Sequence, residues 1–258
     1  MSNFLLVCGG SIAAILVLLV VTLAISRRVG RVSVIDVAWA IGFALIALVG
    51  LALGDGVLWR RVLLAVLTIT WAGRLAIHLA VRSRGGGEDP RYERLLENAP
   101  PGRRQAEAVR RVFVPQGLAM FVVSLPLQVS ASTGDGIPAV VVAGVLVWAA
   151  GLTFEAVGDQ QLKAFKADEN NHGKIMDRGL WAWTRHPNYF GDFAVWLGLY
   201  LVAASAWPGV LTAFSPLAMA YFLVVVTGGR LLEKQMADRP GYADYQARTS
   251  FFFPRPPK

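Results

Sequence analysis

The run FLLVCGGSIAAILVLLVVTLAI, residues 4–25, has no charged side chain and is long enough to cross a lipid bilayer as a helix. Basic residues follow the run, at Arg27, Arg28 and Arg31, and none precedes it, which favours a membrane span over a secretory signal peptide. We expect six further spans, at residues 33–53, 57–81, 112–130, 137–157, 193–207 and 210–232. The predicted fold class is therefore all-α, a polytopic membrane protein with about seven transmembrane helices in one domain, residues 1–258.

Composition supports this class. Of the 258 residues 55% are hydrophobic and only 16% are charged, and the mean hydropathy is +0.50, whereas about a quarter of the residues in a soluble domain carry charge. Of the 25 lysines and arginines, 22 fall on one side of the predicted spans. The positive-inside rule then explains most of the net charge of +8. We predict a multi-pass protein of the cell (inner) membrane with a cytoplasmic C-terminus, and no nucleic-acid partner.

Cysteine and histidine give no sign of a metal site. The single cysteine, Cys8, lies in the first apolar run, where it is best interpreted as a small core residue. The three histidines, His78, His172 and His186, do not have the spacing of zinc ligands. We therefore expect no metal.

The stretch GLWAWTRHPNYFGD, residues 179–192, is the strongest candidate for a functional site. Pro187 suits the first turn of a helix, and a helix that begins there places Asn188 and Asp192 on one face. Arg185 and His186 precede the helix, and Tyr189 lies in its first turn. Such a cluster at the end of an apolar segment indicates a polar ligand at the membrane surface. The alternative is an aromatic belt with ordinary helix-end residues.

A polar stripe follows the predicted span 137–157, which should continue as a helix into Lys166. Its members, Glu155, Asp159, Lys163 and Lys166, share one helix face and could line a cleft with Asn188 and Asp192. A self-paired, solvated face is the alternative. The C-terminal segment, residues 230–257, contains Arg230, Glu233, Tyr242 and Tyr245 and could fold back over the same mouth.

Three short motifs and the C-terminal half resemble a known family. RHPNYFGD (185–192), the preceding GLW and the tail FFFPRPP are similar to the C-terminal half of the steroid 5α-reductases, over about residues 151–256. The wider superfamily includes sterol C14 reductases and, more distantly, isoprenylcysteine carboxyl methyltransferases. IDVAW (35–39), WAGRL (71–75) and GGEDPRY (86–92) are similar to bacterial steroid-reductase-like membrane proteins of uncharacterised function.

The resemblance implies an enzyme with a cytoplasmic cofactor mouth that transfers hydride from NADPH to an activated C=C bond. Asn188 and Asp192 would grip the nicotinamide end, with Asp192 where the family has glutamate. Lysine at 163 and 166 replaces the arginine common in the family and loses bidentate phosphate contact. The expected cofactor-binding set is Glu155, Asp159, Lys163, Lys166, Lys174, Arg185, His186, Asn188, Tyr189, Asp192, Arg230, Glu233 and Tyr245.

The expected catalytic residues depart from the family pattern. Steroid 5α-reductases polarise a ketone with a glutamate in the second span and a tyrosine in the third, whereas this chain offers Asp36 and Trp71. Indole can donate a hydrogen bond but cannot deliver a proton. Asp36 could act as the acid if Arg74 pairs with another carboxylate. Tyr92, His78 or water are the other proton sources.

Three functions remain open from the sequence. The first is an NADPH-dependent reductase of a lipophilic steroid- or isoprenoid-like substrate taken from the bilayer. The second is a methyltransferase that uses S-adenosylmethionine, because RHPxYxG also marks that branch of the superfamily. The third is a non-catalytic lipid-binding membrane protein. The basic inner loops favour the polyanion NADPH over the cationic S-adenosylmethionine.

Overall fold

The computed structural model describes residues 2–226 and 228–257, which divide into two compact units. Unit 1 contains residues 2–137 and 203–212, and unit 2 contains residues 138–202 and 213–257. Each unit is built from helices, and the described residues contain no strand, only an isolated bridge between Thr184 and Ser250.

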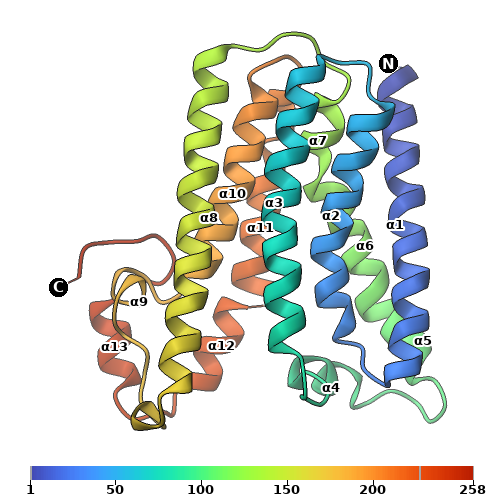
Figure 1. The fold of residues 1–258 in the computed structure, drawn as a ribbon. Coiled ribbons are helices and arrows are strands. Elements are labelled where there is room, and N and C mark those ends of the chain that lie inside the picture. Colours follow the sequence, from blue (N-terminus) through green and yellow to red (C-terminus); the bar gives the residue numbers. More distant parts are fainter. Residues whose placement is uncertain (1, 227, 258) are drawn as a thin grey trace. The chain divides into compact units, whose positions relative to one another are not determined.

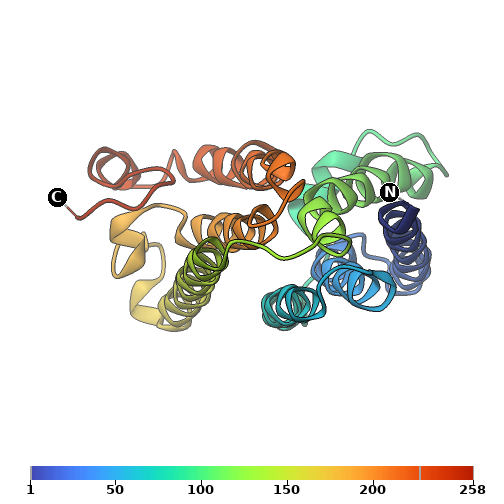
Figure 2. The ribbon, with the colours of Figure 1, turned by 90° about the horizontal axis from the view of Figure 1, so that it is seen from above.

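Three long helices organise unit 1: α1 (Ser2–Val29), α2 (Val34–Leu53) and α3 (Leu58–Arg82). They run alternately down and up, and α2 lies between α1 and α3 (Figures 1 and 2). The remaining elements of unit 1 are short: α4 (Pro90–Leu96), α5 (Arg104–Ala108), the π-helical turn η1 (Val109–Phe113), α6 (Val114–Val123), α7 (Leu125–Ser130) and the 3-10 turn η3 (Gly209–Thr212).

The segment expected to span residues 112–130 is divided at Ser124. Pro126 has no N–H to donate to the preceding turn, so the helical ladder breaks there. The side-chain amide of Gln128 donates to the Phe121 carbonyl at 3.1 Å and to the Ser124 hydroxyl at 2.8 Å. The Phe121 carbonyl at the break thus has a hydrogen-bond donor without a continuous helix.

Unit 2 contains two long helices and a set of shorter ones at their ends. α8 (Pro138–Ala167) continues past Lys166, which confirms the predicted extension of that helix. The other elements are η2 (Glu169–Asn171), α9 (Leu180–Trp183), α10 (Pro187–Ala204), α11 (Phe214–Tyr221), the π-helical turn η4 (Phe222–Val226), α12 (Gly229–Met236) and α13 (Tyr242–Arg248). Viewed along its axis, α10 lies between α8 and the α11–α12 run (Figure 2).

Glycines let α8 and α10 pack with their backbones close together. A Cβ at Gly191 would lie 2.4 Å from the Glu155 amide nitrogen and 2.6 Å from the Gly151 carbonyl oxygen. A Cβ at Gly198 would lie 2.6 Å from the Gly144 carbonyl oxygen. Small residues at helix interfaces are typical of proteins in membranes, where association depends on close van der Waals contact.

Five helical stretches are long and apolar enough to cross a membrane: Asn3–Val29, Val34–Leu53, Leu58–Arg82, Pro138–Ala167 and Gly209–Met236, the last of which passes over residue 227, outside the described residues. The all-α, multi-pass membrane class predicted from the sequence is therefore confirmed. The other two expected spans are also helical. One is divided into α6 and α7, and the other is α10, whose polar first turns lower its mean hydropathy.

Candidate functional site

The stretch 179–192 forms a helical turn, an extended connector and the start of a long helix, all within unit 2. Gly179 has φ +59°, a region that favours glycine, and the α9 turn follows it. Thr184 is extended, and α10 begins at Pro187, as the sequence predicts. Arg185 and His186 therefore lie on the connector immediately before the first turn of α10.

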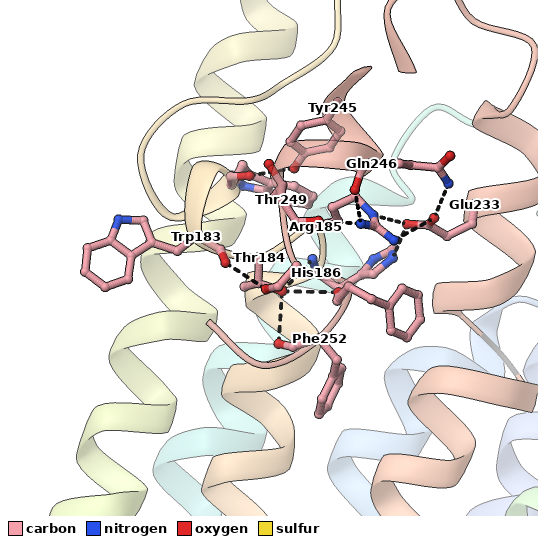
Figure 3. Close-up of polar contacts among 12 residues, drawn as sticks. Trp183, Thr184, Arg185, His186, Glu233, Tyr245, Gln246, Thr249 and Phe252 are labelled. Carbon is pink, nitrogen blue, oxygen red and sulfur yellow. Dashed lines mark hydrogen bonds and ion pairs between the residues drawn. The ribbon is translucent and has the colours of Figure 1, made fainter. Parts of the chain in front are cut away.

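Glu233 of α12 bonds to side chains of this connector and of α13 in a partly buried cluster. We call it the Glu233 cluster, and its members are Arg185, His186, Glu233 and Gln246 (Figure 3). The carboxylate accepts from Arg185 Nε at 2.8 Å and Nη2 at 3.1 Å, a bidentate pair. His186 Nε2 lies 3.1 Å from the same carboxylate, and Gln246 Nε2 donates to it at 2.5 Å. The cluster joins the connector to α12 and α13.

The C-terminal tail folds back onto the connector, as predicted. The Arg185 N–H donates to the Ser250 carbonyl at 2.9 Å, and the Thr184 hydroxyl donates to the Phe252 carbonyl at 2.9 Å. The Tyr245 hydroxyl donates to the Trp181 carbonyl at 2.6 Å. These bonds secure an otherwise irregular backbone, so Arg185, His186, Glu233 and Tyr245 hold the connector and tail together.

The interface between α8 and α10 collects the remaining polar residues of the motif. Asn188 Nδ2 donates to Asp159 Oδ1 at 3.1 Å, so the two predicted faces do meet. Glu155, Asp159 and Asp192 are only 3%, 8% and 7% exposed. These three buried carboxylates and the Asn188 amide make a polar patch, which we call the α8–α10 patch, in an otherwise apolar helix pair.

The lysines and arginine expected to contact the cofactor are exposed: Lys163, Lys166, Lys174 and Arg230. Gln161 of α8 accepts from the Leu180 N–H at 2.9 Å, which places that part of α8 beside the connector. Lys163 and Lys166 lie two and five residues further along the same helix. Tyr189 stacks on His186, with ring centroids 5.5 Å apart and planes 8° from parallel.

Asp36 and Trp71, the expected catalytic pair, have different surroundings within unit 1. Asp36 accepts from the Tyr92 hydroxyl at 2.5 Å and from Arg91 Nη2 at 2.9 Å. Trp71 is fully buried and packs on Phe43, with ring centroids 5.7 Å apart. Phe43 follows Asp36 by seven residues on α2, about 10 Å along the helix axis. Asp36 therefore has Tyr92 and Arg91 as hydrogen-bond partners, and Trp71 has a ring contact with Phe43.

The motif GGEDPRY supplies those neighbours. The Glu88 carboxylate accepts from the backbone N–H groups of Val32, at 2.5 Å, and Ser33, at 2.9 Å, just before α2. Asp89 caps α4 by accepting from the Arg91 N–H at 2.8 Å, and Pro90 occupies the first turn. The loop after α3 thus docks on the start of α2. The sequence contained both motifs, but only tertiary contact reveals their pairing.

Burial and this network shift the pKa values in the loop. Burial raises the pKa of Tyr92 well above its usual range, and the negative charge of Asp36 and its hydrogen bond add to the shift. Burial disfavours ionised Asp89, but its hydrogen bonds to Arg91 outweigh that cost and lower its pKa. Tyr92 therefore stays protonated and can donate a hydrogen bond at any ordinary pH.

In unit 2, burial raises the pKa values of Tyr242 and Tyr245. The hydrogen bond to Glu233 raises the pKa of Tyr242 further, and the neighbouring Tyr242 charge does so for Tyr245. Both phenols therefore stay protonated, and as hydrogen-bond donors they stabilise the folded tail.

The apolar helices and the polar clusters at their ends define an integral membrane protein that crosses the bilayer several times. A family model described as "Protein of unknown function (DUF1295)" matches residues 22–249, and the chain belongs to that family.

The chain is also similar to the "Uncharacterized protein C594.04c" of Schizosaccharomyces pombe, with 36% identity over 95 residues. That match covers 35% of this chain and 27% of the relative, so it spans about a quarter of the relative's length. No solved structure matches the chain.

Proposed function

We propose that this protein is a membrane-embedded reductase that uses NADPH to reduce an activated C=C bond in a lipid-soluble substrate. The observation that carries the proposal is the polar patch between α8 and α10. There the Asn188 amide meets buried Asp159, and Glu155 and Asp192 are buried in the same helix pair. Buried carboxylates in a membrane helix are costly and indicate a functional site.

The side chains of this patch suit the nicotinamide end of NADPH, and two exposed lysines of α8 suit its phosphates. A nicotinamide carboxamide both donates and accepts hydrogen bonds, which an amide beside carboxylates can match. Phosphate groups need cations, and Lys163 and Lys166 provide them at the exposed end of α8. NADPH would supply the hydride when bound. Asn188 and Asp192 would orient the ring, and the two lysines would hold the phosphates.

We assign a positioning role to the Glu233 cluster. Arg185 and His186 both bond to the Glu233 carboxylate, and Tyr245 bonds to the connector backbone. Their hydrogen bonds fix the residues immediately before α10. These contacts would hold the Asn188 and Asp192 side chains in position, and the tail would limit the access of water to that end of α10.

A second candidate has a specific observation in its favour. Glu155, Asp159 and Asp192 could bring negative charge to one helix pair, which suits a cationic ligand better than a polyanion. A methyltransferase that binds S-adenosylmethionine is therefore the alternative. Non-catalytic lipid binding is the third candidate, supported by an apolar groove in unit 1.

Ligand binding tests the proposal. Purified protein in lipid nanodiscs is titrated with NADPH, NADH and S-adenosylmethionine by calorimetry. We expect NADPH to bind, and Asn188→Ala to weaken it by about 5–150-fold, the equivalent of losing about 1–3 kcal/mol for a hydrogen bond in a partly dry site. Asn170→Ala is the matched control, because Asn170 is an exposed amide on η2.

The outcomes separate the candidates. If Lys163 and Lys166 contact the 2′-phosphate, the double variant Lys163→Gln, Lys166→Gln should lower the ratio of NADPH affinity to NADH affinity. Lys234→Gln, which removes another exposed charge, is the control and should leave that ratio unchanged. Binding of S-adenosylmethionine without NADPH would favour the methyltransferase. Binding of neither would support lipid binding alone. Lower stability of Asn188→Ala with unchanged NADPH affinity would make Asn188 a packing residue.

We also propose that the C-terminus and the motif lie on the cytoplasmic side, on the basis of the positive-inside rule. A reporter fused after the last residue should read as cytoplasmic, and one inserted at residues 54–56 should read as external. The reverse result would place the cofactor mouth in a compartment without NADPH.

A further inference from the structure

A groove of about 410 Å³ opens in unit 1 where the end of α1 passes the start of α2. We propose that this groove binds an anionic phospholipid of the surrounding membrane, with an acyl chain along the two helices and the phosphate at Arg31 and Arg84. The inference concerns unit 1 alone and does not depend on the proposed reductase.

The walls of the groove match a hydrocarbon chain. Four lining residues come from α1 and four from α2, and each set has the i, i+3, i+4, i+7 spacing of one helix face: Leu18, Val21, Thr22 and Ile25, and Val34, Val37, Ala38 and Ile41. Seven residues of helix extend about 10 Å, so the groove can hold part of one chain. Both helices are candidate membrane spans, which makes lipid the available apolar ligand.

The mouth of the groove is positively charged. Gly30, with φ +72°, turns the chain after α1, and Arg31 Nη1 then donates to the carbonyls of Ser83, at 3.0 Å, and Gly86, at 2.8 Å. These bonds hold the Arg31 guanidinium at the end of α3, where Arg84 also lines the groove.

No carboxylate neutralises these two arginines in the described ranges 2–226 and 228–257, where neither forms an ion pair. The nearby Glu88 carboxylate is occupied by the backbone N–H groups of Val32 and Ser33. Ser33 and Ser83 also line the mouth, and the Ser83 hydroxyl donates to the Ala80 carbonyl at 3.2 Å. Two cations at the end of an apolar groove complement a phosphate attached to an acyl chain.

The test measures which lipid stays with the protein. The full chain is reconstituted in nanodiscs that contain equal amounts of phosphatidylcholine and phosphatidylglycerol, and retained lipid is counted by native mass spectrometry after release. Wild-type protein should retain phosphatidylglycerol in preference. The double variant Arg31→Gln, Arg84→Gln should lose about thirtyfold in that preference, the equivalent of about 1 kcal/mol for each cation near a membrane surface.

Three further variants keep the test decisive. Arg104→Gln removes an exposed charge of the same unit away from the groove and should change nothing. Val37→Trp fills the groove and should lose phosphatidylglycerol with both arginines present. Because Arg31 also supports the fold, Arg84→Gln alone should show part of the loss at wild-type thermal stability. Equal retention of phosphatidylglycerol by wild type, the arginine variants and Val37→Trp would overturn the proposal, as would an equal loss in Arg104→Gln.

Discussion

Replacement of Glu233 by glutamine should destabilise the protein through the Glu233 cluster. In the wild type, one carboxylate accepts from Arg185, His186 and Gln246, and the side chains of Arg185 and Glu233 are only 11% and 13% exposed. Glutamine keeps the shape but removes the negative charge and turns one acceptor into a donor that faces other donors.

The magnitude follows from this burial. Removal of one partner of a buried ion pair costs about 3–5 kcal/mol, because the other charge stays buried without compensation. Since Arg185 also donates to the carbonyls of Gln246 and Thr249, we expect the lower end, about 3 kcal/mol. For a chain of this size that loss lowers Tm by about 6–12 °C.

The assay is thermal unfolding in detergent, followed by circular dichroism, with limited trypsin digestion as a local readout. In the variant, cleavage after Arg248, which precedes Thr249, should become faster, because the cluster holds the tail on the connector. Glu169→Gln is the control, since Glu169 is an exposed carboxylate of the same unit.

A double replacement tests the charge argument itself. Arg185→Met together with Glu233→Met removes both charges and should recover part of the stability lost in Glu233→Gln. If Glu233→Gln unfolds at the same temperature as Glu169→Gln, with unchanged trypsin cleavage, the cluster does not stabilise the tail and the reasoning is wrong.

Two other predictions concern packing and pH. Gly191→Ala should lower the free energy of unfolding by about 1–3 kcal/mol, because its Cβ would meet the backbone of α8. The control Gly73→Ala on α3, whose Cβ would have nothing within 4 Å, should leave the free energy of unfolding unchanged. Equal Tm values in the two variants would show that α8 and α10 can move apart without cost. Because burial raises the pKa values of Tyr92, Tyr242 and Tyr245, their contribution to stability is complete below the unfolded pKa of about 10 and is lost as pH rises toward the folded values. Tm should therefore fall above about pH 10, less steeply in Tyr92→Phe than in the wild type, and an identical slope in both would refute the role of Tyr92.

Several local features could be predicted from sequence because they depend on neighbours along the chain. Long apolar runs predicted the helices, and Pro187 predicted the first residue of α10. The regular spacing of Glu155, Asp159, Lys163 and Lys166 fitted the predicted continuation of α8 into Lys166, which the structure confirms. Helical periodicity alone also placed Asn188 and Asp192 on one face.

The partners of charged side chains could not be predicted in the same way. The sequence did not predict that Asp36 bonds to Tyr92 and Arg91, which lie 56 and 55 residues away in sequence. Likewise Arg185 and His186 suggested a ligand site, and their main partner is Glu233, 48 and 47 residues away. A side chain within a motif does not reveal whether a ligand or another segment will satisfy it.

The sequence by itself therefore determined the class of this protein and the helices that compose it, because burial in lipid demands long apolar segments whose backbone hydrogen bonds are satisfied within each helix. Only the tertiary structure decided which polar groups meet. That pairing depends on chain turns such as Gly30 and Gly179 and on close glycine contacts such as Gly191 with α8. A buried charge is stable only beside a suitable partner, and the fold alone brings distant partners together.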